Sequence, residues 1–283
     1  MAPALIAGLV QLSVGDDPAV NLPVTQALIA EAAQAGAKFV LTPECTNLIA
    51  GDRNWQAQVL RPQTTDPTLE ALRAQAAGLG IWLLIGSLAL KSDDPAEPRF
   101  VNRSFLIGPD GGIAAQYDKI HMFDVTISDS ESYRESAAYR PGDRAVLAKG
   151  PASLGLSICY DLRFPHLYRA LAQAGAQVLT VPAAFNDTTG AAHWHVLLRA
   201  RAIETGCFVL APAQCGQHAI GPGRQARPRR SYGHSLAVSP WGEIIADAGE
   251  LPGVTIVTLD LNETGKARSR IPALSAQQPF EAP

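Results

Sequence analysis

The segment L-G-L-S-I-C-Y-D-L-R-F-P-H-L-Y, residues 154–168, places a cysteine between a predicted strand and a predicted helix. Residues 154–158 form a short apolar run typical of a buried strand, and Leu167, Leu171 and Ala174 follow at helical spacing. At such a turn the Cys159 sulfur can project outward, while backbone N–H groups of the following residues stay available to an oxyanion. Most free cysteines are buried apolar residues, so this segment alone leaves a catalytic and a structural interpretation open.

The composition describes a globular chain with a large hydrophobic core. Of the 283 residues, 47% are hydrophobic and 17% are charged, which excludes a disordered chain. The formal net charge of −3 provides no positive field for nucleic acid or an anionic membrane. The apolar start of the chain lacks the basic residues of a signal peptide, and no apolar run approaches the length of a membrane span. We therefore expect no nucleic-acid partner and no membrane partner.

The cysteine content favours a reduced, cytoplasmic protein. The 4 cysteines show no C-x-x-C spacing and are too sparse for a disulfide framework or a structural zinc site. We expect Cys45, Cys207 and Cys215 in or near the core, with Cys45 pointing away from the neighbouring Glu44. We expect neither a metal nor another cofactor.

An internal repeat indicates two similar halves. Residues 34–43 (Q-A-G-A-K-F-V-L-T-P) closely match residues 173–182 (Q-A-G-A-Q-V-L-T-V-P), and each copy is predicted to be a helix end, a strand and a proline. Each half also carries a predicted hairpin around a P-x-G turn, at residues 109–111 and 240–242.

These elements predict an α/β fold within a single domain over residues 1–283. We expect a four-layer α-β-β-α sandwich, in which two mixed sheets pack face to face with helices outside, the helices including residues 18–36, 68–79 and 192–205. A doubly wound single sheet is the alternative, but the long hairpins argue against a purely parallel arrangement.

Three reactive side chains follow predicted strands. Glu44 follows F-V-L-T-P, Lys119 follows A-A-Q-Y-D, and Cys159 follows G-L-S-I. Taken separately, Glu44 fits a helix N-terminal carboxylate and Lys119 fits an exposed hairpin end. In mostly parallel sheets, however, functional groups gather beyond the carboxyl ends of the strands. There a carboxylate can take the thiol proton and an ammonium can stabilise an oxyanion, which suffices to hydrolyse a carbon–nitrogen bond without metal.

The segments around these residues resemble the three catalytic motifs of the nitrilase, or carbon–nitrogen hydrolase, superfamily. They are L-T-P-E-C, Y-D-K-I-H-M-F-D and S-I-C-Y-D-L-R-F-P, in the family order and at family-like spacing, and the resemblance extends along nearly the whole chain. It implies that Glu44 is the general base, Lys119 the oxyanion-stabilising lysine and Cys159 the nucleophile. It also implies that the Tyr160 N–H lies at the oxyanion hole and that Glu135 orients the lysine and lines the pocket.

Within the superfamily, the chain is most similar to the Nit-type amidases, in particular to deaminated glutathione amidases. This resemblance implies hydrolysis of a linear amide of a small carboxylate substrate through a thioester, with release of ammonia. It also implies a homodimer or higher homo-oligomer whose sheets continue across the interface. An ω-amidase acting on α-ketoglutaramate, an N-carbamoyl amino acid hydrolase and a true nitrilase are alternatives. An inactive nitrilase-like binding protein is an alternative of another class, against which the intact Glu44, Lys119 and Cys159 argue.

Two further segments invite a functional interpretation. His193 and His195 would share a face on a strand and could then hold a metal, but the segment is predicted to be helical, where residues two apart diverge. Residues 221–230 contain four arginines just before S-Y-G-H-S, which the resemblance places near the mouth of the active site. We expect one or more of these arginines to bind a substrate carboxylate.

Overall fold

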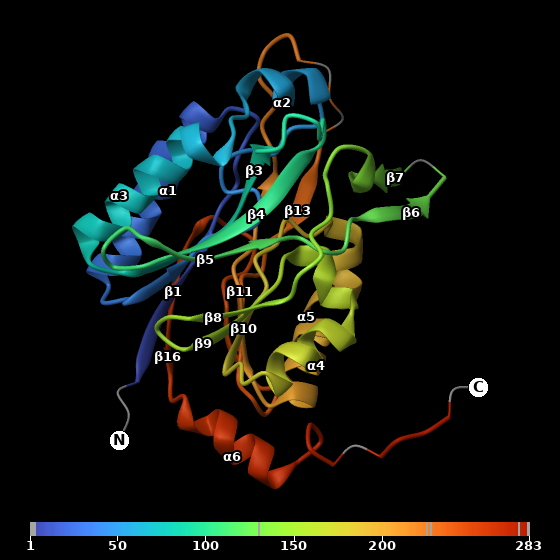
Figure 1. The fold of residues 1–283 in the computed structure, drawn as a ribbon. Helices are drawn as coiled ribbons and strands as arrows, with labels where there is room; N and C mark the ends of the chain where they lie inside the picture. Colours follow the sequence, from blue (N-terminus) through green and yellow to red (C-terminus); the bar gives the residue numbers. More distant parts are fainter. Residues whose placement is uncertain (1–3, 130, 225, 227, 277, 282–283) are drawn as a thin grey trace.

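Two six-stranded sheets form the centre of the computed structural model of the chain, which describes residues 4–129, 131–224, 226, 228–276 and 278–281 (Figure 1). The first sheet has the strand order β16-β1-β2-β3-β4-β5, and the second has the order β15-β14-β11-β10-β9-β8. The strands of the first sheet are β1 (Leu5–Gln11), β2 (Phe39–Leu41), β3 (Trp82–Lys91), β4 (Phe100–Ile107), β5 (Ile113–Asp118) and β16 (Gly253–Leu259). Those of the second are β8 (Val146–Lys149), β9 (Ser153–Leu156), β10 (Val178–Thr180), β11 (Phe208–Ala211), β14 (Leu236–Val238) and β15 (Ile244–Asp247).

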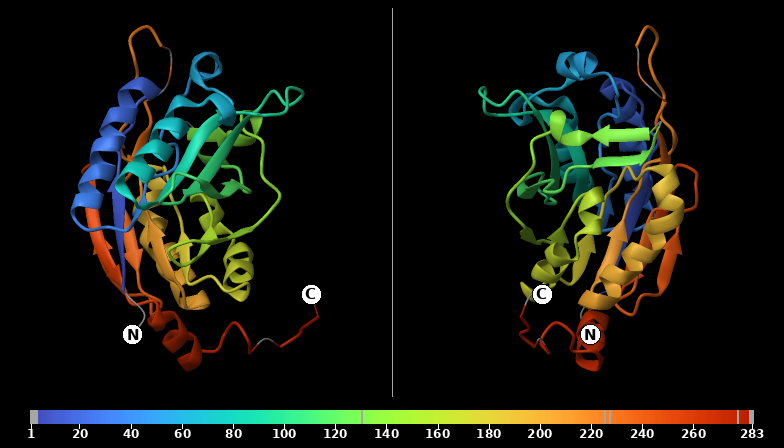
Figure 2. Two further views of the ribbon diagram at one scale, coloured as in Figure 1. Left: turned by 60° about the vertical axis from the view of Figure 1, so that its left-hand side comes forward. Right: turned by 90° about the vertical axis from the view of Figure 1, so that its right-hand side faces the viewer.

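Helices cover the outer face of each large sheet, as the turned views also show (Figure 2). The first sheet carries α1 (Pro18–Gln34) and α3 (Pro67–Leu79), and the second carries α4 (Pro165–Gln173) and α5 (Asp187–Thr205). This arrangement is the predicted four-layer α-β-β-α sandwich, so the expected fold is confirmed. Two further helices, α2 (Arg53–Val59) and α6 (Asn262–Arg270), lie at opposite ends of the molecule (Figure 1).

Short elements complete the chain around these layers. They are the hairpin of β6 (Asp124–Ser128) and β7 (Glu131–Arg134), the pair of β12 (Cys215–Gln217) and β13 (Arg230–Tyr232), and the 3₁₀ turns η1 (Gln63–Thr65), η2 (Glu135–Ala137) and η3 (Cys159–Arg163).

The first sheet is buried on both faces because it packs against the second sheet on one side and against α1 and α3 on the other. Successive residues of its strands point to opposite faces. In β2, Phe39 and Leu41 belong to the hydrophobic cluster between the two sheets, whereas Val40 belongs to the cluster beneath α1 and α3. In β3, Leu84 faces the inner cluster and Leu83 the outer one. These strands therefore need apolar residues at successive positions, and not apolar residues alternating with polar ones.

The predicted repeat and hairpins are present. α1 leads into β2 and α4 leads into β10, and each of these strands pairs in parallel with a neighbour in its own sheet. β4 and β5 pair antiparallel, as do β14 and β15. The single domain over residues 1–283 stays a prediction. None of the helices within the described ranges has the length and apolar character needed to cross a bilayer.

One predicted helix boundary is wrong. α5 begins at Asp187, earlier than the predicted start at residue 192. The Asn186 side chain accepts a hydrogen bond of 3.0 Å from the Thr189 N–H and so caps the helix. The apolar periodicity begins only after this polar first turn, which is why the sequence pattern placed the start too late.

The two sheets approach each other closely at Gly86 in β3. A Cβ atom at this position would lie 2.0 Å from the Thr42 carbonyl oxygen and 2.5 Å from Pro182 Cβ. Thr42 precedes Glu44 in the first half of the molecule, and Pro182 ends the second copy of the repeat. The missing side chain therefore allows the two halves to meet beside the candidate site.

We expect Gly86→Ala to lower the free energy of unfolding by roughly 1–3 kcal/mol, because the methyl group would displace backbone atoms on both sides. Gly78→Ala is the matched control, since a Cβ at this position in α3 has no neighbour within 4 Å. It should stabilise the protein by roughly 0.5–1 kcal/mol through its higher helix propensity. Urea denaturation of the two variants measures both effects. A neutral Gly86→Ala would show that the sheets can separate without cost.

Candidate active site

The predicted reactive residues line one cavity. Its volume is about 540 Å³, within the range usual for small-molecule sites. Glu44 follows β2, Lys119 follows β5 and Cys159 follows β9, so three strand ends from the two sheets meet at this cavity. Glu135, from the η2 turn, lines it as well.

Lys119 is the ionic centre of the cavity. Its Nζ atom lies 2.8 Å from Glu44 Oε1, and 3.0 and 2.9 Å from the two carboxylate oxygens of Glu135. The Lys119 and Glu44 side chains are only 3% and 4% exposed. Glu135 also accepts a 2.6 Å hydrogen bond from the Phe123 N–H. The ammonium is therefore held between two carboxylates that are themselves anchored.

Glu44 is oriented by bonds to both of its carboxylate oxygens. Oε1 accepts a 2.9 Å hydrogen bond from Asn102 Nδ2 in addition to the bond from Lys119, and Oε2 accepts a 2.8 Å bond from the Ala184 N–H. Burial raises the pKa of Glu44, but the Lys119 charge and the bonds from Lys119, Cys159 and Ala184 outweigh it and lower the pKa to about 2. Glu44 is therefore ionised at neutral pH.

Cys159 lies at the first position of η3 with a positive φ of 49°, a strained conformation for a residue other than glycine. Its N–H donates to the Pro182 carbonyl over 2.9 Å, which fixes the turn against the end of β10. Burial and the negative charge of Glu44 raise the pKa of the thiol well above 9. The sulfur is thus protonated at neutral pH and lies in the same cavity as an ionised carboxylate that can accept its proton.

The fully buried Asp161 holds the Cys159 turn against the neighbouring strands. Oδ2 accepts hydrogen bonds from the Ile158 N–H over 2.9 Å and from the Tyr117 hydroxyl over 2.7 Å. Oδ1 accepts a 3.0 Å bond from the His121 N–H, two residues after Lys119. One carboxylate thereby connects the segments that carry the thiol and the ammonium.

Aromatic side chains form one wall of the cavity. The Tyr160 and Phe123 rings lie 5.1 Å apart, as do the Phe123 and Tyr133 rings. Phe185 and Tyr139 also line the cavity. These rings form an apolar surface beside the charged groups of the cavity.

Sequence reasoning missed Asn102 and Asp161. Asn102 is a buried amide within the otherwise apolar run of β4, and this polar residue in a buried strand was its only signal. Asp161 belongs to the segment quoted for Cys159, but an aspartate beside a turn is common and carries no signal of its own. Their roles depend on contacts with distant segments, which sequence spacing does not reveal.

The cysteine expectations are met in part. Cys207 and Cys215 are buried, as expected. Cys45 is half-buried and packs against the outer hydrophobic cluster, as expected, and it also lines the cavity; that its side chain points away from Glu44 stays a prediction. Its φ of 56° is positive, an uncommon conformation for a residue other than glycine, directly after Glu44.

The two histidines of the H-W-H segment have separate partners, as helical spacing predicts. His193 Nδ1 lies 3.3 Å from an Arg163 nitrogen, whereas His195 Nε2 lies 2.9 Å from Asp247 Oδ2. They do not share a site.

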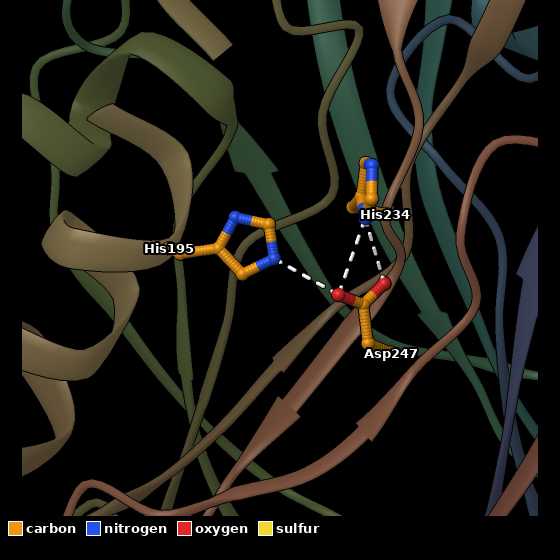
Figure 3. Close-up of side chains that lie close together, drawn as sticks. All are labelled: His195, His234 and Asp247. Carbon is orange, nitrogen blue, oxygen red and sulfur yellow. Dashed lines mark hydrogen bonds and ion pairs between the residues drawn. The ribbon is translucent and has the colours of Figure 1, made fainter. Parts of the chain in front are cut away.

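His195 instead meets His234 and Asp247 in a cluster outside the cavity lining (Figure 3). His234 Nδ1 lies 2.9 and 3.1 Å from the two carboxylate oxygens of Asp247. The potential ligand atoms of the three residues lie within 4.8 Å of one another, so they could hold a metal ion. Both imidazoles already hydrogen-bond to the carboxylate, which links α5 to β15 without a metal. The absence of a metal from the protein stays a prediction.

The arginines of residues 221–230 have different surroundings. Arg224 pairs with Asp16, and Arg230 lies 3.2 Å from Asp187. Neither of these two arginines lines the cavity, whereas Arg229 does. Arg227 lies outside the described residues.

A four-layer sandwich that brings a thiol, a carboxylate and an ammonium together at its strand ends is the arrangement expected of a nitrilase-type hydrolase. The family model of the carbon–nitrogen hydrolases matches residues 6–269. The chain therefore belongs to the carbon–nitrogen hydrolase family, as its motifs predicted.

Similarity to known proteins supports this assignment. The deaminated glutathione amidase of Bos taurus is 38% identical over 272 residues, covering 95% of this chain and 80% of the relative. The deaminated glutathione amidase of Yersinia enterocolitica is 37% identical over 268 residues, covering 94% of this chain and 90% of the relative. The crystal structure of Saccharomyces cerevisiae Nit3, a member of branch 10 of the nitrilase superfamily, matches with a TM-score of 0.82 at 28% identity. This match covers 97% of this chain and 96% of that chain.

Lys119→Met would leave two carboxylates facing each other in a buried site. We expect the variant to lose roughly 3–5 kcal/mol of unfolding free energy at pH 7, because one partner of a buried ion pair is removed. The pKa of Glu44 is lowered from 4.5 to about 2, so its stabilising contribution is complete above pH 4.5 and is lost as the pH falls toward 2. The deficit should therefore shrink on acidification, as urea denaturation at pH 7 and about pH 3.5 would show. An equal deficit at both values would contradict the ion-pair description.

Proposed function

We propose that this carbon–nitrogen hydrolase is an amidase that uses Cys159 as the nucleophile, Glu44 as the general base and Lys119 as the oxyanion-stabilising cation. The observation that supports this assignment best is that the Cys159 thiol lines one cavity with the Glu44 carboxylate and the Lys119 ammonium, which lie 2.8 Å apart. A thiol with a raised pKa is a poor nucleophile until a base removes its proton, and Glu44 is placed to do so.

In the acylation step, Glu44 accepts the thiol proton as the sulfur attacks the amide carbon. The carbonyl π electrons move to the oxygen, where the Lys119 ammonium and the Tyr160 N–H stabilise the negative charge. The carbon–nitrogen bond then breaks as the proton passes from Glu44 to the departing nitrogen. A neutral amine leaves and a thioester remains on Cys159.

In the deacylation step, Glu44 takes a proton from water as the water oxygen attacks the thioester carbon. The same donors stabilise the second oxyanion. When the carbon–sulfur bond breaks, the sulfur regains the proton from Glu44 and the acyl group leaves as a carboxylic acid. Glu135 acts as a positioning residue in both steps because both of its carboxylate oxygens bond to the Lys119 ammonium.

We propose deaminated glutathione as the substrate, because relatives that match most of the chain are named for it. Glutathione contains peptide bonds and no primary amide, so this substrate would release a peptide amine. The predicted ammonia would be the product of a primary amide such as α-ketoglutaramate, the substrate of the rival ω-amidase reaction. The leaving group therefore distinguishes the two candidates.

The experiment measures product formation from deaminated glutathione, α-ketoglutaramate and an N-carbamoyl amino acid. We expect the highest kcat/KM for deaminated glutathione and an acyl-enzyme mass adduct on Cys159 after rapid acid quenching. Cys159→Ala should reduce kcat to the background rate, because no thioester can form.

Cys45→Ala is the matched control, since this second thiol lines the same cavity and has no role in the proposed chemistry. The variant should keep activity within a few-fold of the wild type. Activity that survives in Cys159→Ala would refute the mechanism, and a wild type that releases no amine from any amide would favour the inactive binding protein.

We also propose that the protein is a cytoplasmic homodimer. α5 exposes Val196 and Ile203 to 67% and 54%, and the nearby Trp241 is 51% exposed. β15 and β16 lie at sheet edges, where sheets can continue into a partner. All 4 cysteines are unpaired, which suits a reducing compartment and can be tested by cell fractionation.

Light scattering of the purified protein should give the mass of two chains of 29.9 kDa each. Ile203→Glu should shift the protein toward the monomer, because a charge would be buried in the apolar interface. A monomeric wild type at micromolar concentration would contradict the proposed assembly.

A further inference from the structure

Arg229 lines the cavity and is linked to Glu44 through Ala184. Its Nη2 atom donates a 2.9 Å hydrogen bond to the Ala184 carbonyl oxygen, and the N–H of the same residue donates to Glu44. The Arg229 carbonyl oxygen accepts a 3.0 Å bond from the His218 N–H, which fixes the backbone. The guanidinium is thus held beside the proposed general base by rigid main chain.

Arg229 has no carboxylate within 4.0 Å among the described side chains. Its loop neighbours differ, since Arg224 pairs with Asp16 and Arg230 with Asp187. Within the cavity, the Glu44 and Glu135 carboxylates both pair with the Lys119 ammonium. A guanidinium has five N–H donors, and among the described residues this half-buried one is bonded to the Ala184 carbonyl oxygen alone.

Other cationic side chains of the cavity are less suited to this role. The Arg134 guanidinium donates to the Val125 and Tyr133 carbonyl oxygens and is directed along the β6–β7 hairpin. Arg53 is exposed at the start of α2, where water screens its charge. Arg229 alone combines partial burial, a fixed backbone and a direct link to Glu44 among these three.

We infer that Arg229 forms a carboxylate-binding subsite that selects amides whose acyl part ends in a carboxylate, an inference that rests on the proposed amidase function. The planar guanidinium matches a carboxylate with two parallel hydrogen bonds, which a lysine cannot reproduce. Arg229 and Cys159 line the same cavity, so a substrate whose carboxylate binds Arg229 shares that cavity with the sulfur.

The test compares glutaramate, which carries a terminal carboxylate, with glutaramide, in which a neutral amide replaces it. We expect Arg229→Gln to lower kcat/KM for glutaramate by about 10- to 100-fold, the range of a charge-assisted hydrogen bond, chiefly through KM. Glutaramide hydrolysis should change by less than about 3-fold. Arg229→Lys should retain an intermediate preference for glutaramate, because the lysine keeps the positive charge but cannot form the two parallel hydrogen bonds.

Arg230→Gln is the matched control, since this adjacent arginine is exposed, pairs with Asp187 and does not line the cavity. It should leave the ratio of the two kcat/KM values unchanged. Equal losses of kcat/KM for glutaramate and glutaramide in Arg229→Gln would overturn the subsite and assign the residue a structural role. An Arg229→Gln variant that hydrolyses both substrates as the wild type does would also overturn the subsite.

A binding measurement separates this inference from the proposed function. Calorimetry with glutarate and the Cys159→Ala protein requires no turnover, and adding Arg229→Gln should raise the Kd at least 10-fold. If the wild type hydrolyses no amide, the proposed function fails while the glutarate result still decides the subsite. An unchanged Kd, or no binding of glutarate at all, would refute it.

Discussion

The buried ammonium of Lys119 between Glu44 and Glu135 is the interaction on which the rest of the site depends. Taking charges out of water costs several kcal/mol per ion, and this cost is offset only when partners and hydrogen bonds are placed correctly. Here the partners come from β2, β5 and the η2 turn, and Asn102 and the Phe123 N–H complete their bonds. The ion pairs lower the pKa of Glu44, and ionised Glu44 in turn raises the pKa of Cys159. Lys119 thus keeps the proposed base ionised, while burial and the Glu44 charge keep the thiol protonated.

The two-sheet fold provides the geometry that this ionic arrangement needs. Each half contributes a helix, a strand and a proline, and the strand ends of the two halves face each other at the cavity. Gly86 allows the close approach, while the Ala184 N–H from one half binds Glu44 from the other. The Gln214 side chain donates a further 3.0 Å bond to the Glu44 carbonyl oxygen. Backbone groups, which cannot relax as side chains do, therefore fix the base against the thiol.

Much of the fold and the centre of the site could be predicted from the sequence, for physical reasons. Glu44, Lys119 and Cys159 each follow an apolar strand, and strand ends converge, so local pattern and topology were enough to group them. Glu135 lies in an irregular segment and was found only through family resemblance. Asp161, Asn102 and the distinction of Arg229 from Arg224 depend on partners more than thirty residues away, which no local pattern encodes. The start of α5 was missed because its first turn is polar.

The raised pKa of the Cys159 thiol has a consequence for the chemical durability of the protein. Peroxides oxidise thiolates far faster than thiols, and low-pKa, accessible cysteines are the ones that oxidants convert to sulfenic acid. Cys159 is buried, and in the proposed mechanism its thiol loses its proton only as the sulfur attacks a substrate carbonyl. The sulfur is therefore activated only during the reaction itself. An enzyme built in this way can remain in its reduced, working form under oxidative stress without a dedicated reductant to restore it.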